Sequence, residues 1–176
     1  MTRIRLAETH DAEAIGRIQI AAWRQAYAHF LPADFLAALD GAARAAQWRT
    51  RIGQAAHAEA PTFVALDETD AVRGFAHTGL VRDDDLSLEG RAEVYTVYVD
   101  PAVWRHGIGR ALMAAVDAFW ASTDVRELTL WAFEENREGR AFYERLGWAP
   151  DGATQVDDFG GVHPVELRYS RMLASS

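Results

Sequence analysis

A glycine-containing segment in the middle of the chain has the residue types of a phosphate-binding turn. Residues 104–110, WRHGIGR, follow a segment of alternating apolar residues and precede a run with helical spacing. A turn between a strand and a helix directs several backbone N–H groups and the helix N-terminus at one point, which favours a phosphate or pyrophosphate. Glycine lets such a ligand approach the backbone without meeting a Cβ atom. Taken alone, the same residues also fit a plain turn that binds nothing.

Two other nucleotide-binding motifs fit these residues poorly. A P-loop requires a lysine after its second glycine, and all 18 basic residues of the chain are arginine. A Rossmann fingerprint requires a third small residue where Leu112 stands, and it opens a βαβ unit instead of following three other strands. Glu134 does lie at about the distance expected of a ribose-binding acid. The residues therefore favour a different phosphate-containing ligand over a dinucleotide.

Two motifs together resemble those of the GNAT acetyltransferases. Val97–Pro101 followed by WRHGIGRAL resembles the acetyl-CoA-binding signature [QR]-x-x-G-x-[GA], with Trp104 in the place of the family's Gln or Arg. Residues 136–148, NREGRAFYERLGW, resemble the second signature, N-x-x-A-x-x-[FL]-Y-x-x-x-G-[FW]. The order of elements is similar to that of the family over essentially the whole chain. The resemblance implies one N-acetyltransferase domain over residues 1–176 that uses acetyl-CoA.

The same resemblance assigns residues to the cosubstrate. It implies that the pantetheine arm pairs with the backbone of the strand that ends at Val99, and that the pyrophosphate lies on the glycine turn. Nearby arginines, Arg137 and Arg140 among them, suit the 3′-phosphate, although solvated surface charge explains them equally. The residues expected to hold acetyl-CoA are Val97, Tyr98, Val99, Arg105, His106, Gly107, Ile108, Gly109, Arg110 and Asn136.

Amide formation from an amine and a thioester needs a neutral amine, a stabilised oxyanion and a protonated leaving thiolate. Tyr143 is the candidate proton donor, because it lies two helical turns after Asn136 and both can face the cosubstrate from one side. Packing alone would also explain a buried Tyr143. Asn136 is equally suited to cap a helix, and a cap can bind a ligand as well.

Glu93 is the candidate base. Strict alternation places it on the same strand face as Tyr95, Val97 and Val99. A base glutamate in the histone-acetylating branch of the family resembles it in type and offset. A water chain is an alternative, as are three acids near the last predicted strands: Asp157, Asp158 and Glu166.

The first helix carries the candidate acceptor residues. Trp23 and Tyr27 lie four residues apart and share a helix face, in a region that borders the acceptor site in similar proteins. The function expected is acetyl transfer from acetyl-CoA to a primary amine of a small molecule, by direct attack in a ternary complex. The alternatives are an N-terminal or peptide amine as acceptor, and a non-catalytic acyl-CoA-binding domain. Similar proteins are often homodimers.

Hydrophobic periodicity predicts one α/β domain with a mixed central sheet flanked by helices. Arg3–Leu6 alternates as a strand, a helix follows it, and helical character then extends from Pro32 to about Ala56 with an internal boundary left open. The later segments are strands 61–66 and 72–80, a strand at 93–99 that stops at Asp100-Pro101, a helix over 108–119, a strand at 128–133, a helix over 136–146, and two strands around 159–161.

Composition excludes several classes of function. The net charge of −8 argues against a broad nucleic-acid footprint and is compatible with a cationic substrate. The N-terminal segment lacks the apolar run of a signal peptide and no stretch reads as a membrane span, so a soluble, cytoplasmic protein is expected. The chain has no cysteine, and its histidines show no metal-ligand spacing, so no metal site is expected.

Overall fold

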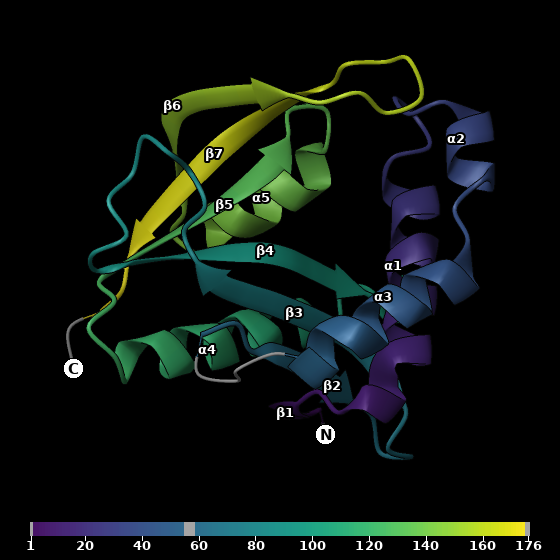
Figure 1. Ribbon diagram of the computed structural model, residues 1–176, viewed down its shortest axis with the longest axis horizontal. Coiled ribbons are helices and arrows are strands. Elements are labelled where there is room, and N and C mark those ends of the chain that lie inside the picture. The colour runs from purple at the N-terminus through teal and green to yellow at the C-terminus, as the bar shows by residue number, and fades with distance from the viewer. Residues whose placement is uncertain (1, 55–58, 175–176) are drawn as a thin grey trace.

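The strands of the computed structural model, which describes residues 2–54 and 59–174, form a mixed sheet in the order β1-β2-β3-β4-β5-β7-β6 (Figure 1). The strands are β1 Arg3–Leu6, β2 Thr62–Leu66, β3 Val72–Leu80, β4 Arg91–Val99, β5 Glu127–Phe133, β6 Ala149–Val156 and β7 Val165–Met172. The helices are α1 Ala12–Ala26, α2 Ala33–Ala37, α3 Gly41–Gln54, α4 Ile108–Ala121 and α5 Arg137–Arg145, with short 3-10 turns η1 Thr9–Asp11 and η2 Pro101–Val103. The predicted fold class and order of elements are confirmed.

The helical stretch predicted after Pro32 divides into α2 and α3. A carboxylate oxygen of Asp40 accepts hydrogen bonds from the backbone N–H groups of Ala42 (2.8 Å) and Ala43 (3.3 Å), so Asp40 caps the N-terminus of α3. The Arg24 guanidinium donates to the carbonyl of Leu36 (3.0 Å) at the end of α2. The predicted end of this stretch, near Ala56, lies outside the described residues.

Strand pairing is antiparallel throughout the described sheet except between β4 and β5. These two strands run parallel, and α4 forms the crossover between them. A parallel pair requires such a crossover, because the chain has to return to the same end of the sheet. The glycine turn therefore lies where β4 ends and α4 begins.

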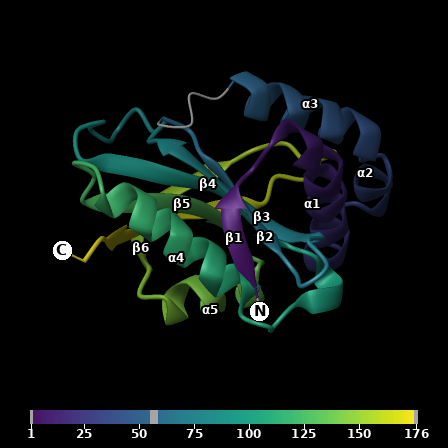
Figure 2. The ribbon, with the colours of Figure 1, turned by 90° about the horizontal axis from the view of Figure 1, so that it is seen from below.

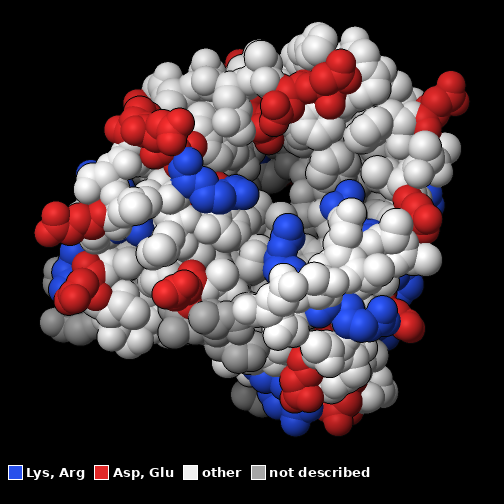
Figure 3. All heavy atoms as spheres, in the orientation of Figure 1, with Lys and Arg blue, Asp and Glu red and all other residues white. Residues whose placement is uncertain are grey.

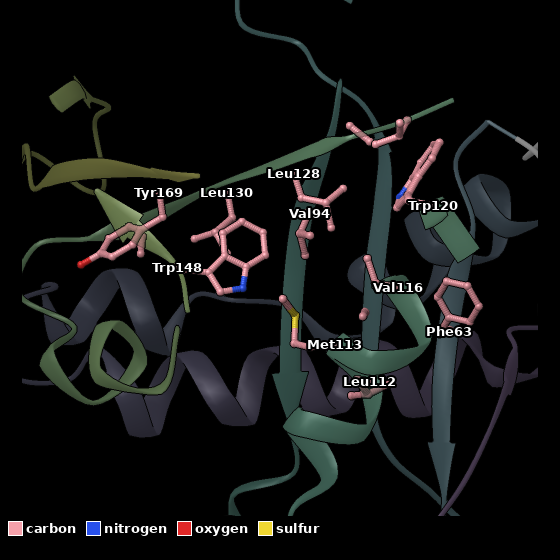
Figure 4. Packing of buried hydrophobic residues seen from close by; sticks show 14 of the residues in the cluster. Phe63, Val94, Leu112, Met113, Val116, Trp120, Leu128, Leu130, Trp148 and Tyr169 are labelled. Atoms are coloured by element: carbon pink, nitrogen blue, oxygen red, sulfur yellow. The ribbon is translucent and has the colours of Figure 1, made fainter. Parts of the chain in front are cut away.

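One face of the sheet is covered by α4 and α5. The apolar stripe of α4 consists of Leu112, Met113, Val116 and Trp120, which are at most 3% exposed. These side chains pack against β4 and β5, as Figure 4 shows. Burying each large apolar side chain contributes about 1.5–3 kcal/mol, so this stripe fixes α4 against the sheet.

The opposite face is covered by α1 and α3 (Figure 2). Ile15 and Ile18 of α1 pack with Trp48 of α3 onto the sheet. Gly16 permits the close approach of the two helices, because a Cβ atom there would lie 2.9 Å from the backbone nitrogen of Ala45. The sheet therefore separates a side formed by α4 and α5 from a side formed by α1 and α3.

Candidate active site

Strands β4 and β5 diverge halfway along their length (Figure 1). They pair only over Arg91–Val94 and Glu127–Leu130, and beyond this point β4 follows β3 whereas β5 follows β7. The Asp100 N–H donates to the Arg73 carbonyl on the β3 side (2.8 Å). Because successive residues of a strand direct their backbone groups to opposite sides, Val97 and Val99 direct theirs into the opening. An extended ligand such as a pantetheine arm can pair with this free edge.

A β-bulge in β4 lies beside the opening. Val94 pairs with Thr78 and Thr96 pairs with His77, so Tyr95 is an extra residue without a partner on β3. The bulge reverses the alternation of side chains. Val97 then lies on the α4 side of the sheet, whereas Tyr95 contacts the ring of His77 on the α3 side.

The predicted orientation of Glu93 is therefore only partly right. Glu93 lies opposite Gly79, and the next pair along the strands is Val94 with Thr78. This next pair faces α4, because Thr78 accepts a hydrogen bond from the Trp120 indole (2.8 Å). Glu93 consequently shares the α3 side with Tyr95, as predicted. The prediction that it shares a face with Val97 and Val99 is wrong, because strict alternation does not hold across the bulge.

The turn before α4 has the backbone geometry of an anion-binding site. Arg105 and Gly107 both have positive φ angles, 67° and 82°. The Ala111 N–H donates to the carbonyl of Gly107 (3.0 Å), which is the first hydrogen bond of α4. The backbone N–H groups before Ala111, in the glycine turn and in the first turn of α4, therefore lack an acceptor within the helix. Gly109 lies under the ring of Phe142, and a Cβ atom on it would lie 3.1 Å from that ring. The turn thus offers free N–H donors at a helix N-terminus.

Side chains of the turn bind mostly to the protein itself. The Trp104 indole donates to the Val99 carbonyl (2.8 Å), and His106 Nδ1 contacts the Trp104 carbonyl (2.9 Å). Arg105 forms an exposed ion pair with Glu138 of α5 (2.9 Å), which spans the distance between the turn and the start of α5. Arg110 is exposed, whereas Ile108, the first residue of α4, is buried in the core between α4 and the sheet. The role of Trp104 was missed from the sequence, where only its departure from the family pattern was apparent.

A cavity of about 250 Å³ lies at the opening between β4 and β5. Figure 3 shows this face of the molecule hollowed between the part formed by β6 and β7 and the part formed by α1 and α2, with acidic side chains along the rim beside the β6–β7 loop. The residues that line the cavity come from four regions. They are Gln19, Trp23 and Tyr27 of α1, Arg82 and residues 93–98 around β4, residues 131–133, Asn136 and Tyr143 of β5 and α5, and Gln155, Asp157, Phe159 and Glu166 near the C-terminal strands.

Aromatic rings form the wall of this cavity on the α1 side. The rings of Trp23 and Tyr27 lie 5.2 Å apart, as centroids, and Trp23 also contacts Phe133 (6.3 Å) and Phe159 (5.9 Å). Tyr98 accepts a hydrogen bond from the Trp23 indole (2.7 Å), so its side chain belongs to this wall. Phe133 and Phe159 were not identified from the sequence, although Phe133 ends a predicted strand.

Tyr143 and Asn136 line the cavity from the α5 side. Burial raises the pKa of Tyr143, with a smaller contribution from Tyr98, so its hydroxyl stays protonated well above neutral pH. Asn136 caps α5, since its side-chain oxygen accepts from the Gly139 N–H (3.1 Å). The helix thus fixes both side chains at the edge of the opening.

Glu93 forms a two-point ion pair with Arg82. One carboxylate oxygen accepts from Arg82 Nη2 (2.6 Å), and the other accepts from Arg82 Nε (3.1 Å) and from the Arg82 backbone N–H (3.2 Å). The Glu93 side chain is only 3% exposed. Both oxygens of the predicted base are therefore already engaged by a cation.

A buried arginine, Arg168, fixes the loop that carries the exposed Arg82. Arg168 of β7 pairs with Asp85 of this loop (2.7 Å) and with Asp151 of β6 (2.6 Å). The Trp131 indole of β5 donates to Asp83 of the same loop (3.1 Å). The β3–β4 loop is thereby held across the sheet, and this holds Arg82 against Glu93.

Neither a metal-ligand cluster nor a membrane-spanning helix is found in the part of the chain that the structure describes. No cluster of three or more His, Asp or Glu side chains suited to a metal ion occurs within them. Among the helices of residues 2–54 and 59–174, none has both the length and the apolar character needed to cross a membrane.

Comparisons with known proteins agree with this geometry. Residues 17–148 match the model of the acetyltransferase (GNAT) family. The chain is 29% identical over 136 residues to the N-acetyltransferase YuaI of Bacillus subtilis, covering 77% of this chain and 74% of YuaI. It is 31% identical over 107 residues to the peptidyl-lysine N-acetyltransferase YjaB of Escherichia coli, covering 61% of this chain and only 62% of YjaB.

The fold is also similar to that of yncA from Salmonella typhimurium, a structure solved with its cofactor acetyl-CoA. The TM-score is 0.73 at 21% identity, and the match covers all of this chain and 96% of the other. The divergent strands and the free N–H groups of the turn fit this cosubstrate. The chain thus belongs to the GNAT acetyltransferase family and is an acetyl-CoA-dependent N-acetyltransferase.

Proposed function

We propose that this N-acetyltransferase acetylates the primary amine of a small molecule, which attacks acetyl-CoA directly while both are bound. The observation that carries the proposal is the position of the cavity, which lies between the free edge of β4 and the aromatic wall of α1. An amine in the cavity and a thioester along the edge would lie next to each other. Such an arrangement needs no covalent enzyme intermediate.

The groups proposed to take part in the reaction lie on different sides of the opening between β4 and β5. The N–H groups of Val97 and Val99 point into the opening and can stabilise the oxyanion that forms during attack. Tyr143 lies on the α5 side and has its proton available for the leaving thiolate. The acceptor then approaches from the α1 side, where Trp23 and Tyr27 stand. Acetyl-CoA is accordingly proposed to be held by the β4 edge and by the turn at residues 105–110, with Asn136 beside its reactive end.

The size and closure of the cavity favour a small acceptor. A volume of about 250 Å³ corresponds to about eight water molecules, which suits a small amine. Phe159 of the β6–β7 loop lines the cavity and contacts Trp23, Phe35 and Phe133, with ring centroids 5.2–5.9 Å apart, and we propose that this ring closes one end. A peptide would need a groove open at both ends. The similarity to YjaB keeps a lysine side chain as the second candidate acceptor.

The lining also indicates the chemical character of the amine. Rings on the α1 side favour an apolar body and attract a cationic head by cation–π interaction. The carboxylates of Asp157 and Glu166, which also line the cavity, would repel an acceptor that carries its own carboxylate. We therefore expect alkyl or aralkyl amines to be better acceptors than free amino acids.

An amine panel tests this function. The panel pairs alkyl and aralkyl amines with amino acids of similar size and with peptides that offer an N-terminal amine or a lysine. Release of the CoA thiol reports turnover, with no background from the protein because it has no cysteine. The highest kcat/KM is expected for the small amines without a carboxylate. A higher kcat/KM for the peptides would replace the small-molecule proposal by the peptide one.

A Phe159→Ala variant tests whether the Phe159 ring closes one end of the cavity. Loss of this ring should raise KM for small amines and relax the discrimination against peptides, with CoA binding unchanged in calorimetry. Absence of any CoA binding by the wild-type protein would contradict the assignment of the cosubstrate site.

A further inference from the structure

We propose that Glu166, and not Glu93, accepts the proton of the acceptor ammonium group. This inference rests on the proposed function, because it names the base of the same reaction. Glu166 lines the cavity from β7, next to the aromatic wall. It is one of three carboxylates that line the cavity, the others being Glu93 and Asp157.

The position of Glu166 follows from strand register. It lies directly opposite Phe133, the last residue of β5, in an antiparallel pair, and paired residues share a face of the sheet. Phe133 packs with Trp23 and Tyr27 on the α1 side. Glu166 therefore faces the side from which the acceptor approaches, whereas Tyr143 belongs to α5 on the opposite side.

The hydrogen bonds of Glu166 leave it free to accept a proton. One carboxylate oxygen accepts from the amide of Gln155 on β6 (2.8 Å), a neutral donor that orients the group without neutralising its charge. Glu93, in contrast, is held at both oxygens by Arg82. The Arg82 cation stabilises the charged form of Glu93 and so opposes its protonation. The Gln155 amide that bonds Glu166 carries no charge, so Glu166 is the better acceptor.

Electrostatics around Glu166 agree with this role. Burial raises its pKa, and the negative charges of Asp157 on the β6–β7 loop and Glu93 on β4 add to the effect. The Arg82 cation on the β3–β4 loop is paired with Glu93, and Tyr27 and Tyr98 face Glu166 as neutral phenols. A carboxylate with a raised pKa takes a proton from an ammonium group more readily than an ordinary one.

Glu166 and Tyr143 exchange protons with the reactants and with solvent during the transfer. A Glu166 oxygen takes one proton from the ammonium nitrogen, and the freed lone pair forms the C–N bond with the thioester carbonyl carbon. The C–S bond then breaks, and the thiolate takes the Tyr143 hydroxyl proton. The nitrogen loses its second proton to solvent, and solvent restores Tyr143 and Glu166. The products are an amide, free CoA thiol and one proton released to solvent.

Rate profiles against pH in three variants test the assignment. For the best amine of the panel, kcat/KM is measured from about pH 5 to about pH 9 in the wild type and in E166Q, E93Q and E89Q. The wild type should lose activity on the acidic side as its base is protonated. E166Q should lose about 100-fold in kcat/KM near neutral pH and should lack this acidic limb. E93Q should keep the limb but move it to lower pH, because Glu166 loses a negative neighbour. E89Q, which changes an exposed acid outside the cavity, should match the wild type.

A Gln155→Leu variant gives an independent readout if E166Q folds poorly. Removing the donor to the carboxylate should shift the acidic limb to higher pH, because the charged form loses a hydrogen bond. An E166Q enzyme that keeps the wild-type limb and kcat/KM would overturn the role of Glu166 while leaving the proposed function intact. A wild-type protein that binds CoA but acetylates no amine would overturn the proposed function and this inference together.

Discussion

The indole Nε1 of Trp104 donates a hydrogen bond to the Val99 carbonyl over 2.8 Å. This bond joins the last residue of β4 to the first residue of the glycine turn. Val99 directs its carbonyl into the opening between β4 and β5, so the indole satisfies this acceptor and leaves the Val99 N–H free. Trp104 therefore holds the two halves of the cosubstrate site, the free edge and the turn, in a fixed relation.

A Trp104→Phe variant should weaken CoA binding. Phenylalanine keeps most of the apolar contact but lacks the N–H donor, so the turn has to be ordered by the ligand instead. We expect the Kd for CoA to rise about fivefold in calorimetry and the free energy of unfolding to fall by about 1 kcal/mol. Trp120→Phe is the control, because it removes the buried bond from Trp120 to Thr78 (2.8 Å), far from the turn. Equal CoA affinity in the two variants would contradict the role of Trp104.

Replacement of Gly107 by valine should weaken CoA binding specifically. Gly107 has a φ angle of 82°, and a Cβ atom on it would meet no protein atom within 4 Å, so the space beside it is open for a ligand. Gly152 on β6 has the same features, a φ angle of 99° and open space, and supplies the control. Both variants should lose about 1–2 kcal/mol of stability. Only Gly107→Val should lose at least about tenfold in CoA affinity, and similar losses in both variants would count against the turn as the phosphate site.

A Tyr143→Phe variant should bind CoA normally and turn over about 10- to 100-fold more slowly. Burial keeps the pKa of this phenol above its ordinary value, so no loss of activity from its ionisation is expected below about pH 9. Tyr169→Phe is the matched control, since its hydroxyl bonds Arg140 (2.9 Å) and Glu144 (3.0 Å) away from the cavity. That control should lose stability but keep kcat. An unchanged kcat in Tyr143→Phe would exclude Tyr143 as the proton donor.

The order of elements was predictable because it depends on local periodicity. The α4 stripe, the alternation along β1 and the β-rich residues of β3 and β5 are local patterns, and each predicted the correct element. The orientation of Glu93 was not predictable, because the bulge at Tyr95 depends on how β4 pairs with β3. The engagement of Glu93 by Arg82 likewise depends on a loop that distant residues hold in place.

The sequence alone did not single out two residues that line the cavity, Phe159 and Glu166. Phe159 lies in a glycine-containing turn that indicates only a connection between strands. Glu166 was one of several acids near the end of the chain, and only its pairing with Phe133 places it on the acceptor side. Contacts between segments that are distant in sequence leave no periodic signal, so a single sequence could not rank these residues.

His77 should make the stability of the protein depend on pH between about 6.5 and about 4. Burial, with the nearby positive charge of Arg51, lowers the pKa of His77 from 6.5 to about 4. Trp48 and Tyr95 enclose its ring, at centroid distances of 5.5 and 5.1 Å, and its Nδ1 lies 3.3 Å from the carbonyl of Pro61. The folded protein therefore keeps this imidazole neutral where the unfolded chain protonates it.

The sign of the effect follows from proton counting. Between these two pH values the unfolded chain binds more protons than the folded protein, so stability falls as the pH falls. At about pH 4 the loss is of the order of 3 kcal/mol, since each pKa unit corresponds to about 1.4 kcal/mol. Urea unfolding of the wild type and of His77→Gln at a series of pH values measures it. The variant starts less stable at neutral pH, because it repacks a buried site, but the difference between the two proteins should shrink as the pH falls. A constant difference across this range would show that His77 is protonated equally in the folded and unfolded states.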